Sequence, residues 1–210
     1  MVLTSDNGWP YTWGQGLNER IHDCYVNCEV DRVWQTVKGD LNGWLSSHGK
    51  KKTSPDPFVL IGTSGIGKSM NAGSYLLYQL LHYDAEKLQV VVYRIAERSY
   101  LFDKTTETVT HYAEESTFLR VMGELSGRGM RGYLIHNVTE PIHEPSVRLL
   151  PRGWCMIVVT PPEESDHRGR RKQLGGRRIL MKCPEEKDVK AMCMWMRCGS
   201  PGRQAVYWQE

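Results

Sequence analysis

Short apolar runs alternate along this chain with longer stretches in which apolar residues recur every three or four positions. The runs are rich in Val, Ile and Leu and are bounded by Gly, Pro or polar residues, which is typical of buried β-strands. They occupy residues 58–61, 88–95, 133–135, 156–159 and 179–181. Because buried strands alternate with helices, the pattern predicts an α/β fold of three layers, in which helices cover a mostly parallel sheet.

The helical periodicity is clearest ahead of the first strand, over residues 29–47. Apolar residues face one side and charged residues the other, so we expect an N-terminal amphipathic helix that docks on the domain that follows. Further helices are expected at 70–83, 114–127 and 184–197, with a small hairpin at 100–112. Residues 1–28 are aromatic-rich but irregular, and we expect them to form an extended arm.

Pro, Gly and charged residues divide the chain further. Residues 48–57 combine all three and predict a solvated linker, which leaves residues 58–198 as the main domain. Residues 199–210 resemble the beginning of another helix, so we interpret them as the start of a truncated C-terminal region. On this interpretation the chain is a fragment or a shortened copy.

Composition excludes several classes of protein. The 210 residues are 40% apolar and 24% charged, as in an ordinary globular protein. No apolar run is long enough to span a membrane, and the N-terminus is no signal peptide, so we expect a soluble intracellular protein without membrane contact. The net charge of only +3 excludes a general polycation, and the six scattered cysteines indicate free thiols rather than a metal cluster.

The first strand runs directly into GTSGIGKS, which matches the phosphate-loop pattern G-x-x-x-x-G-K-[ST] at every defined position. Glycines let several backbone N–H groups point into one concavity, and the positive end of the next helix adds to the attraction for phosphate. The lysine supplies charge to the terminal phosphates, and the serine hydroxyl can ligate Mg²⁺. The expected nucleotide-binding residues are Gly62, Thr63, Ser64, Gly65, Ile66, Gly67, Lys68 and Ser69.

Catalysis at such a loop needs an acidic residue at the tip of a neighbouring strand, which holds Mg²⁺ through water. The expected strand, residues 132–138, has Asn137 at this position. An amide oxygen can bind water but does not compensate the charge of the metal, so Ser69 and Asn137 predict a weakened Mg²⁺ site. Thr160, which follows the next strand, is either a sensor of the terminal phosphate or an ordinary loop start. The candidate catalytic residues are therefore Lys68, Asn137 and Thr160.

A basic cluster lies within residues 166–178, before the last expected strand. Three interpretations are open: a solvated flexible loop, a surface for RNA or for chromatin and transcription machinery, and an arginine finger that reaches a neighbouring copy in a homo-oligomer. The residues of the cluster are Arg168, Arg170, Arg171, Lys172, Arg177 and Arg178.

Several stretches together resemble the retrotransposon hot spot proteins of trypanosomes. They are VLIGTSGIGKSMNAGSYLLYQLLHYDAEKLQVVVYRIAE, GYLIHNV, GWCMIVVTPPEES and RRILMKCPEEKDVKAMCMWM, within a similarity that covers roughly residues 29–210. The resemblance implies an ATPase-like domain, a location in and around the nucleus, and a role linked to transcription elongation and messenger RNA export.

The chain departs from the family pattern at two positions. Ser64 replaces a proline that is usual in the loop, and Asn137 stands where the family usually carries Asp. We therefore expect a nuclear protein with a phosphate-loop domain of the additional-strand class, which binds ATP and Mg²⁺ but hydrolyses ATP weakly. The alternatives are a non-catalytic module that binds nucleotide or nucleic acid, and a small-molecule kinase or GTPase; no N-K-x-D base-reading motif supports a GTPase.

Overall fold

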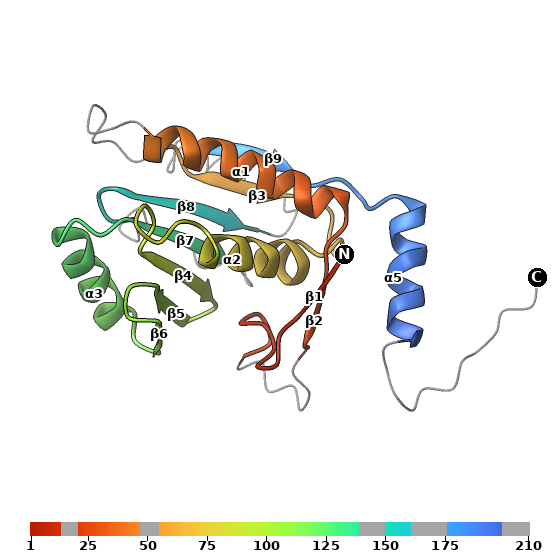
Figure 1. The fold of residues 1–210 in the computed structure, drawn as a ribbon, viewed down its shortest axis with the longest axis horizontal. Coiled ribbons are helices and arrows are strands. Elements are labelled where there is room, and N and C mark those ends of the chain that lie inside the picture. Colours follow the sequence, from red (N-terminus) through yellow and green to blue (C-terminus); the bar gives the residue numbers. More distant parts are fainter. Residues whose placement is uncertain (14–20, 47–54, 139–149, 161–175, 199–210) are drawn as a thin grey trace, which may run out of the picture.

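The computed structural model describes residues 1–13, 21–46, 55–138, 150–160 and 176–198. At its centre lies a seven-stranded sheet in the order β6-β5-β4-β7-β8-β3-β9 (Figure 1). The strands are β3 (Phe58–Ile61), β4 (Val90–Ile95), β5 (Arg98–Asp103), β6 (Thr108–Tyr112), β7 (Gly132–Asn137), β8 (Trp154–Val159) and β9 (Arg177–Leu180).

Most of the sheet is parallel. The pairings among β4, β7, β8, β3 and β9 are all parallel, whereas β4–β5 and β5–β6 are antiparallel hairpin pairings. β8 lies between β3 and β7, although it follows both of them in the chain. The carboxyl ends of the parallel strands therefore meet at one edge, where ligands bind in α/β sheets. The predicted α/β fold with a mostly parallel sheet is confirmed.

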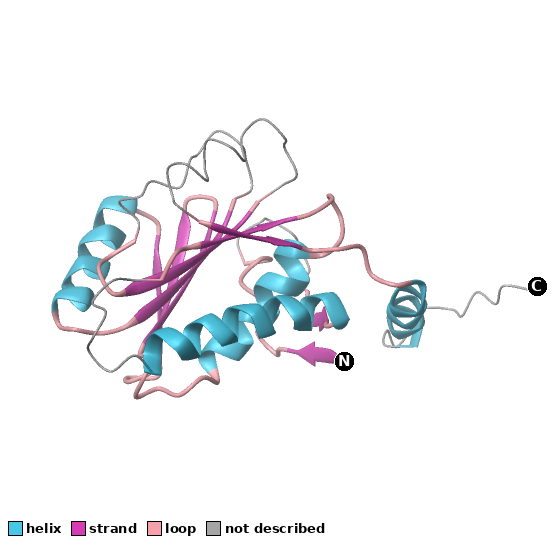
Figure 2. Ribbon diagram, turned by 90° about the horizontal axis from the view of Figure 1, so that it is seen from above, coloured by secondary structure: helices cyan, strands magenta, loops and turns pink. Residues whose placement is uncertain are grey.

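Helices cover both faces of the sheet. α1 (Cys28–Ser46) and α2 (Gly73–Leu81) lie on one face and α3 (Glu115–Gly127) lies on the other (Figure 2). A π-helical turn, η1 (Lys68–Ala72), leads directly into α2. α5 (Glu186–Cys198) lies outside these layers, near the N-terminal residues (Figure 1), where Trp195 Nε1 donates a hydrogen bond of 3.2 Å to Asp23 Oδ2.

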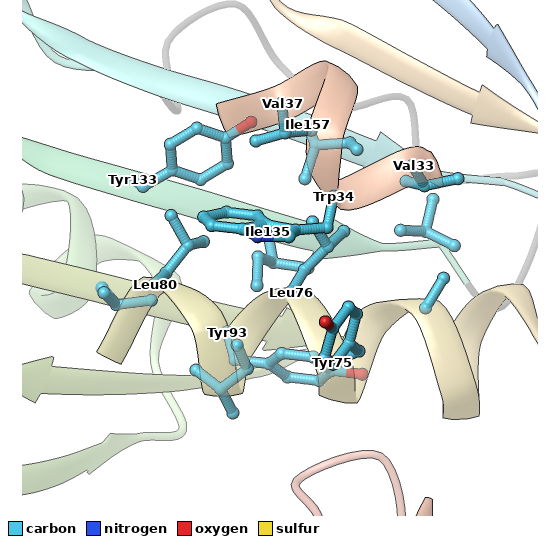
Figure 3. Packing of buried hydrophobic residues seen from close by; sticks show 14 of the residues in the cluster. Val33, Trp34, Val37, Tyr75, Leu76, Leu80, Tyr93, Tyr133, Ile135 and Ile157 are labelled. Carbon is cyan, nitrogen blue, oxygen red and sulfur yellow. The ribbon is translucent and has the colours of Figure 1, made fainter. Parts of the chain in front are cut away.

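The side chains of the central strands alternate between two apolar cores. Tyr93, Ile135 and Ile157 face α1 and α2 (Figure 3), whereas Val92, Leu134 and Met156 face α3. The residues that α1 buries in the first core are Val30, Val33, Trp34, Val37, Leu41 and Leu45. Since these residues pack in one cluster with β3 and β7, the amphipathic helix completes the hydrophobic core of the sheet domain.

The N-terminal residues contain a two-stranded antiparallel sheet of β1 (Val2–Thr4) and β2 (Asp23–Tyr25), which the sequence did not predict. Strands of three residues are too short for apolar alternation to reveal them. Trp9 and Cys24 are buried in the main core. Trp13 packs edge-on against Tyr100 of β5, with 5.1 Å between the ring centroids. The aromatic residues therefore anchor this segment to the sheet domain.

Within the described ranges, no helix has the length and apolar character needed to cross a membrane. The same part of the chain holds no group of three or more His, Cys, Asp or Glu side chains arranged for a metal ion. Five cysteines are free thiols: Cys24 and Cys155 are buried, and Cys28, Cys183 and Cys193 are exposed.

Candidate phosphate-binding site

The turn between β3 and η1 depends on two glycines with left-handed backbone conformations. Gly65 has φ 78° and Gly67 has φ 88°, values that other residues adopt only at a cost. At Gly67 a Cβ would also lie only 2.5 Å from Asn71 Nδ2, so the Asn71 side chain would have to shift to admit one. The left-handed conformation thus explains the glycine at both positions, of which only Gly67 is defined by the motif.

Gly62 is required for a different reason. A Cβ at this residue would lie 2.7 Å from the backbone oxygen of Met181 and 2.8 Å from Ile66 Cδ1. Met181 follows β9 and donates its N–H to Ile61 O at 2.8 Å, which holds it beside the loop. The Thr63 hydroxyl lies 3.7 Å from the sulfur of Cys183, two residues further on. The segment after β9 thus forms one wall of the loop.

Helix η1 begins at the end of the loop with a wide turn. The backbone N–H groups of Asn71 and Ala72 both donate to Gly67 O, at 2.8 and 2.9 Å. π-helical turns occur frequently at functional sites. The first N–H groups of any helix have no partner within the helix, and the helix dipole makes this end positive. The loop therefore presents donors to an anion at the carboxyl edge of the sheet.

Lys68 is folded back over its own loop. Its ammonium group donates to Gly62 O at 2.7 Å and to Thr63 O at 2.6 Å. Only 7% of the residue is exposed. Burial lowers the pKa of the Lys68 ammonium below its ordinary value because the charged form loses hydration. A phosphate placed over the loop would restore a charged partner to this cation.

Ser69 and Asn137 are brought together from η1 and the end of β7. The Ser69 hydroxyl donates a hydrogen bond of 2.9 Å to Asn137 Oδ1. Asn137 is 1% exposed, and its Nδ2 donates to the Tyr93 hydroxyl at 3.4 Å. Hydroxyl and amide oxygens are hard ligands of the kind that Mg²⁺ takes, directly or through water. The donor set therefore fits the metal, although it supplies no negative charge.

Thr160 follows β8 and lies beside β3. It is buried, and its backbone N–H donates to Leu60 O at 3.2 Å, which extends the pairing of the two strands. Thr160 therefore stands at the carboxyl edge of the sheet, next to the strand that leads into the phosphate loop. Its role as a phosphate sensor stays a prediction.

Two residues of the predicted basic cluster belong to a strand. Arg177 and Arg178 are the first residues of β9, so their assignment to a loop is wrong. Arg177 forms an ion pair with Asp40 of α1, and its guanidinium lies 4.5 Å from the ring centroid of Phe58. These contacts connect β9 to α1 and β3. The other four residues, Arg168, Arg170, Arg171 and Lys172, lie outside the described residues.

Three residues next to the site were not predicted: Asn71, Tyr93 and Met181. Asn71 and Met181 contact the loop through packing, which no motif describes. Tyr93 does carry a signal, because it is the one aromatic residue in the strand VVVYRI and places a polar hydroxyl in an apolar run. Its partner Asn137 could not be identified without knowing that β4 and β7 pair.

Comparisons with known proteins agree with this geometry. The family model "Retrotransposon hot spot protein, P-loop domain" matches residues 59–209, and the model "Retrotransposon hot spot proteins N-terminal" matches residues 1–56. A search of curated proteins found no significant match. The two matched regions together cover nearly the whole sequence, and the first alone covers more than half of it. The chain therefore belongs to the retrotransposon hot spot protein family.

Proposed function

We propose that this protein binds ATP together with Mg²⁺ at the loop formed by residues 62–69. The single observation that carries the proposal is the hydrogen bond of 2.9 Å from Ser69, the last residue of a complete phosphate-loop motif, to Asn137. Ser69 is the residue that would ligate the metal. Asn137 stands at the end of the neighbouring strand, where phosphate-loop proteins carry the residue that completes the metal site. The position of β8 between β3 and β7 supports assignment to the additional-strand class.

Each side chain has a distinct task in this proposal. Lys68 exchanges its bonds to Gly62 O and Thr63 O for bonds to phosphate oxygens, which compensate its charge. The Ser69 oxygen retains lone pairs for a cation while its hydroxyl donates to Asn137 Oδ1. Bound Mg²⁺ supplies positive charge that neutralises the phosphates.

We expect ATP hydrolysis at this site to be slow. Asn137 is neutral, so it neither compensates the metal charge nor accepts a proton from an attacking water as a carboxylate could. Thr160 is the residue that we propose contacts the terminal phosphate, on the basis of its place at the end of β8. We therefore infer nucleotide binding with slow turnover.

Calorimetric titration with ATP and a turnover assay test this function together. Wild type should bind ATP more tightly with Mg²⁺ than with EDTA, and Lys68→Ala should lose most of the binding. Lys87→Ala is the matched control, because Lys87 is an exposed lysine paired with Asp84 away from the loop. Turnover that depends on Lys68 supports a slow ATPase. Binding without turnover supports the alternative, a non-catalytic nucleotide-dependent interaction module, and absence of ATP binding in wild type rejects both.

We further propose a nuclear location and a role in transcription elongation and messenger RNA export. The support is the resemblance to the family and the basic composition of residues 166–178. Salt-dependent RNA binding that Arg170→Ala, Arg171→Ala and Lys172→Ala together abolish would support direct contact with nucleic acid. Binding that is absent in wild type, or unaffected by these changes, would reject it.

A further inference from the structure

Asn137 differs from the usual aspartate in that its two side-chain ends are not equivalent. A carboxylate presents oxygen in either orientation, whereas an amide presents an acceptor at Oδ1 and two donors at Nδ2. If the side chain of Asn137 turned over, it would direct N–H groups toward Ser69 and toward any cation there. An asparagine at this position therefore works only if its orientation is fixed.

The structure contains a group that satisfies the amide nitrogen in the orientation that turns the oxygen toward Ser69. The Tyr93 hydroxyl lies 3.4 Å from Asn137 Nδ2 and accepts its hydrogen bond, while Asn137 Oδ1 accepts the bond from Ser69 at 2.9 Å. β4 and β7 are paired in register, with Tyr93 opposite Ile135, so Tyr93 and Asn137 lie on the same face of neighbouring strands. The three side chains form one chain of hydrogen bonds from the sheet to the loop.

Tyr93 is itself held firmly. Its side chain is fully buried in the core between the sheet and α2 (Figure 3). Its hydroxyl lies against the backbone at the start of α2, where a Cβ at Gly73 would be only 3.2 Å away. Burial raises the pKa of the Tyr93 hydroxyl far above its ordinary value, so the group stays neutral.

We infer that Tyr93 is a positioning residue for the metal site, because it pairs the buried N–H of the Asn137 amide while the amide oxygen faces Ser69. This inference rests on the proposed function, since the orientation matters only when a cation binds beside Ser69. Tyr93 does not touch the ligand in this account and acts through Asn137 alone. It compensates in part for the loss of the acidic residue, because Asn137 can present its oxygen to a cation without leaving its own buried N–H unpaired.

Tyr93→Phe tests the inference by removing the hydroxyl and keeping the ring. We expect the ratio of ATP affinity with Mg²⁺ to that with EDTA to fall about three- to tenfold, the effect of one buried hydrogen bond. Tyr133→Phe is the matched control. Tyr133 is also buried on this face of the sheet, and its hydroxyl has no hydrogen-bond partner within the described residues, so the ratio should not change.

The decisive comparison repeats Tyr93→Phe in the Asn137→Asp background. A carboxylate has no N–H group that loss of the Tyr93 hydroxyl would leave unpaired, so the same change should no longer lower the Mg²⁺-dependent ratio there. An equal loss in both backgrounds, or no loss in the Asn137 protein, would overturn the inference and show that Tyr93 only packs. Wild type without Mg²⁺-dependent ATP binding would instead reject the proposed function itself, and the inference with it. Urea unfolding of each variant confirms that the compared proteins are folded.

Discussion

The Ser69 hydroxyl donates a hydrogen bond of 2.9 Å to Asn137 Oδ1, although 68 residues separate the two in the chain. The loop places Ser69 at the start of η1, and the parallel pairing of β7 with β4 and β8 places Asn137 at the same edge of the sheet. This contact brings together two oxygen atoms of the proposed metal site but no negative charge. The chemistry of the site is therefore decided by the type of residue at position 137.

Replacing Asn137 by Asp should strengthen the metal site. We expect Asn137→Asp to raise Mg²⁺ affinity in the presence of ATP about tenfold, since changes beside metal ligands commonly alter affinity by about 10- to 100-fold. The ATPase rate should rise as well. Calorimetry at varied Mg²⁺ concentration and a phosphate-release assay measure the two effects. If neither quantity rises, Asn137 does not occupy the metal-binding position.

Two glycine substitutions separate a packing requirement from ordinary helix propensity. Gly62→Ala would place a Cβ 2.7 Å from Met181 O, so we expect a loss of about 1–3 kcal/mol in the free energy of unfolding and weaker ATP binding. Gly123→Ala lies on α3 with open space around it and should stabilise the protein by about 1 kcal/mol. Urea denaturation measures both. Equal effects of the two changes would show that the contact between Gly62 and Met181 is not tight.

The helix α1 should be essential to the stability of the sheet domain. Trp34 is 3% exposed and lies in the core shared by α1, α2 and the sheet (Figure 3), so Trp34→Ala should cost about 3–5 kcal/mol of unfolding free energy. Lys38→Ala, at an exposed position of the same helix, should change it by less than about 0.5 kcal/mol. Similar unfolding midpoints for both variants would mean that α1 does not pack against the sheet domain in solution.

The buried thiol of Cys24 makes stability depend on pH in alkaline solution. Burial raises the pKa of Cys24 from 9.0 to about 12, so the unfolded chain loses this proton at a lower pH than the folded protein does. The contribution of the Cys24 thiol to the free energy of unfolding is complete below pH 9. It falls as pH rises from about 9 toward 12, by up to about 1.4 kcal/mol per pH unit.

Urea unfolding at pH 8 and pH 10 measures this dependence. The loss of stability between the two values should be smaller in Cys24→Ala than in wild type. Cys193→Ala, which removes an exposed thiol, should behave as wild type does. An unchanged loss in Cys24→Ala would show that the Cys24 thiol is not buried in solution.

Much of the fold could be predicted because its signals are local. The apolar runs of β3 and β8 and the periodicity of α1 appear directly in the sequence, and the motif alone places the loop between β3 and η1. Asn137 was identified as the counterpart of Ser69 because it ends an apolar run. The β1–β2 sheet was missed because its strands are short, and Arg177 was misplaced because its basic neighbours obscured the beginning of β9.

The remaining features of the site depend on contacts between distant segments. Tyr93 and Met181 lie beside the loop only because β4 pairs with β7 and β9 pairs with β3. The hydrogen bonds from the Lys68 ammonium to Gly62 O and Thr63 O likewise depend on the geometry of the loop. Residue type and spacing contain no information about these arrangements.

The central claim is that the loop binds a nucleotide through its phosphates. Calorimetric titration of wild type and Lys68→Ala with ATP, inorganic triphosphate and adenosine, all with Mg²⁺, tests it most directly. We predict that ATP and triphosphate bind wild type, that adenosine binds far more weakly, and that Lys68→Ala weakens the two phosphate ligands about 10- to 100-fold. Adenosine binding as tight as that of ATP, or ATP binding unchanged by Lys68→Ala, would contradict the claim.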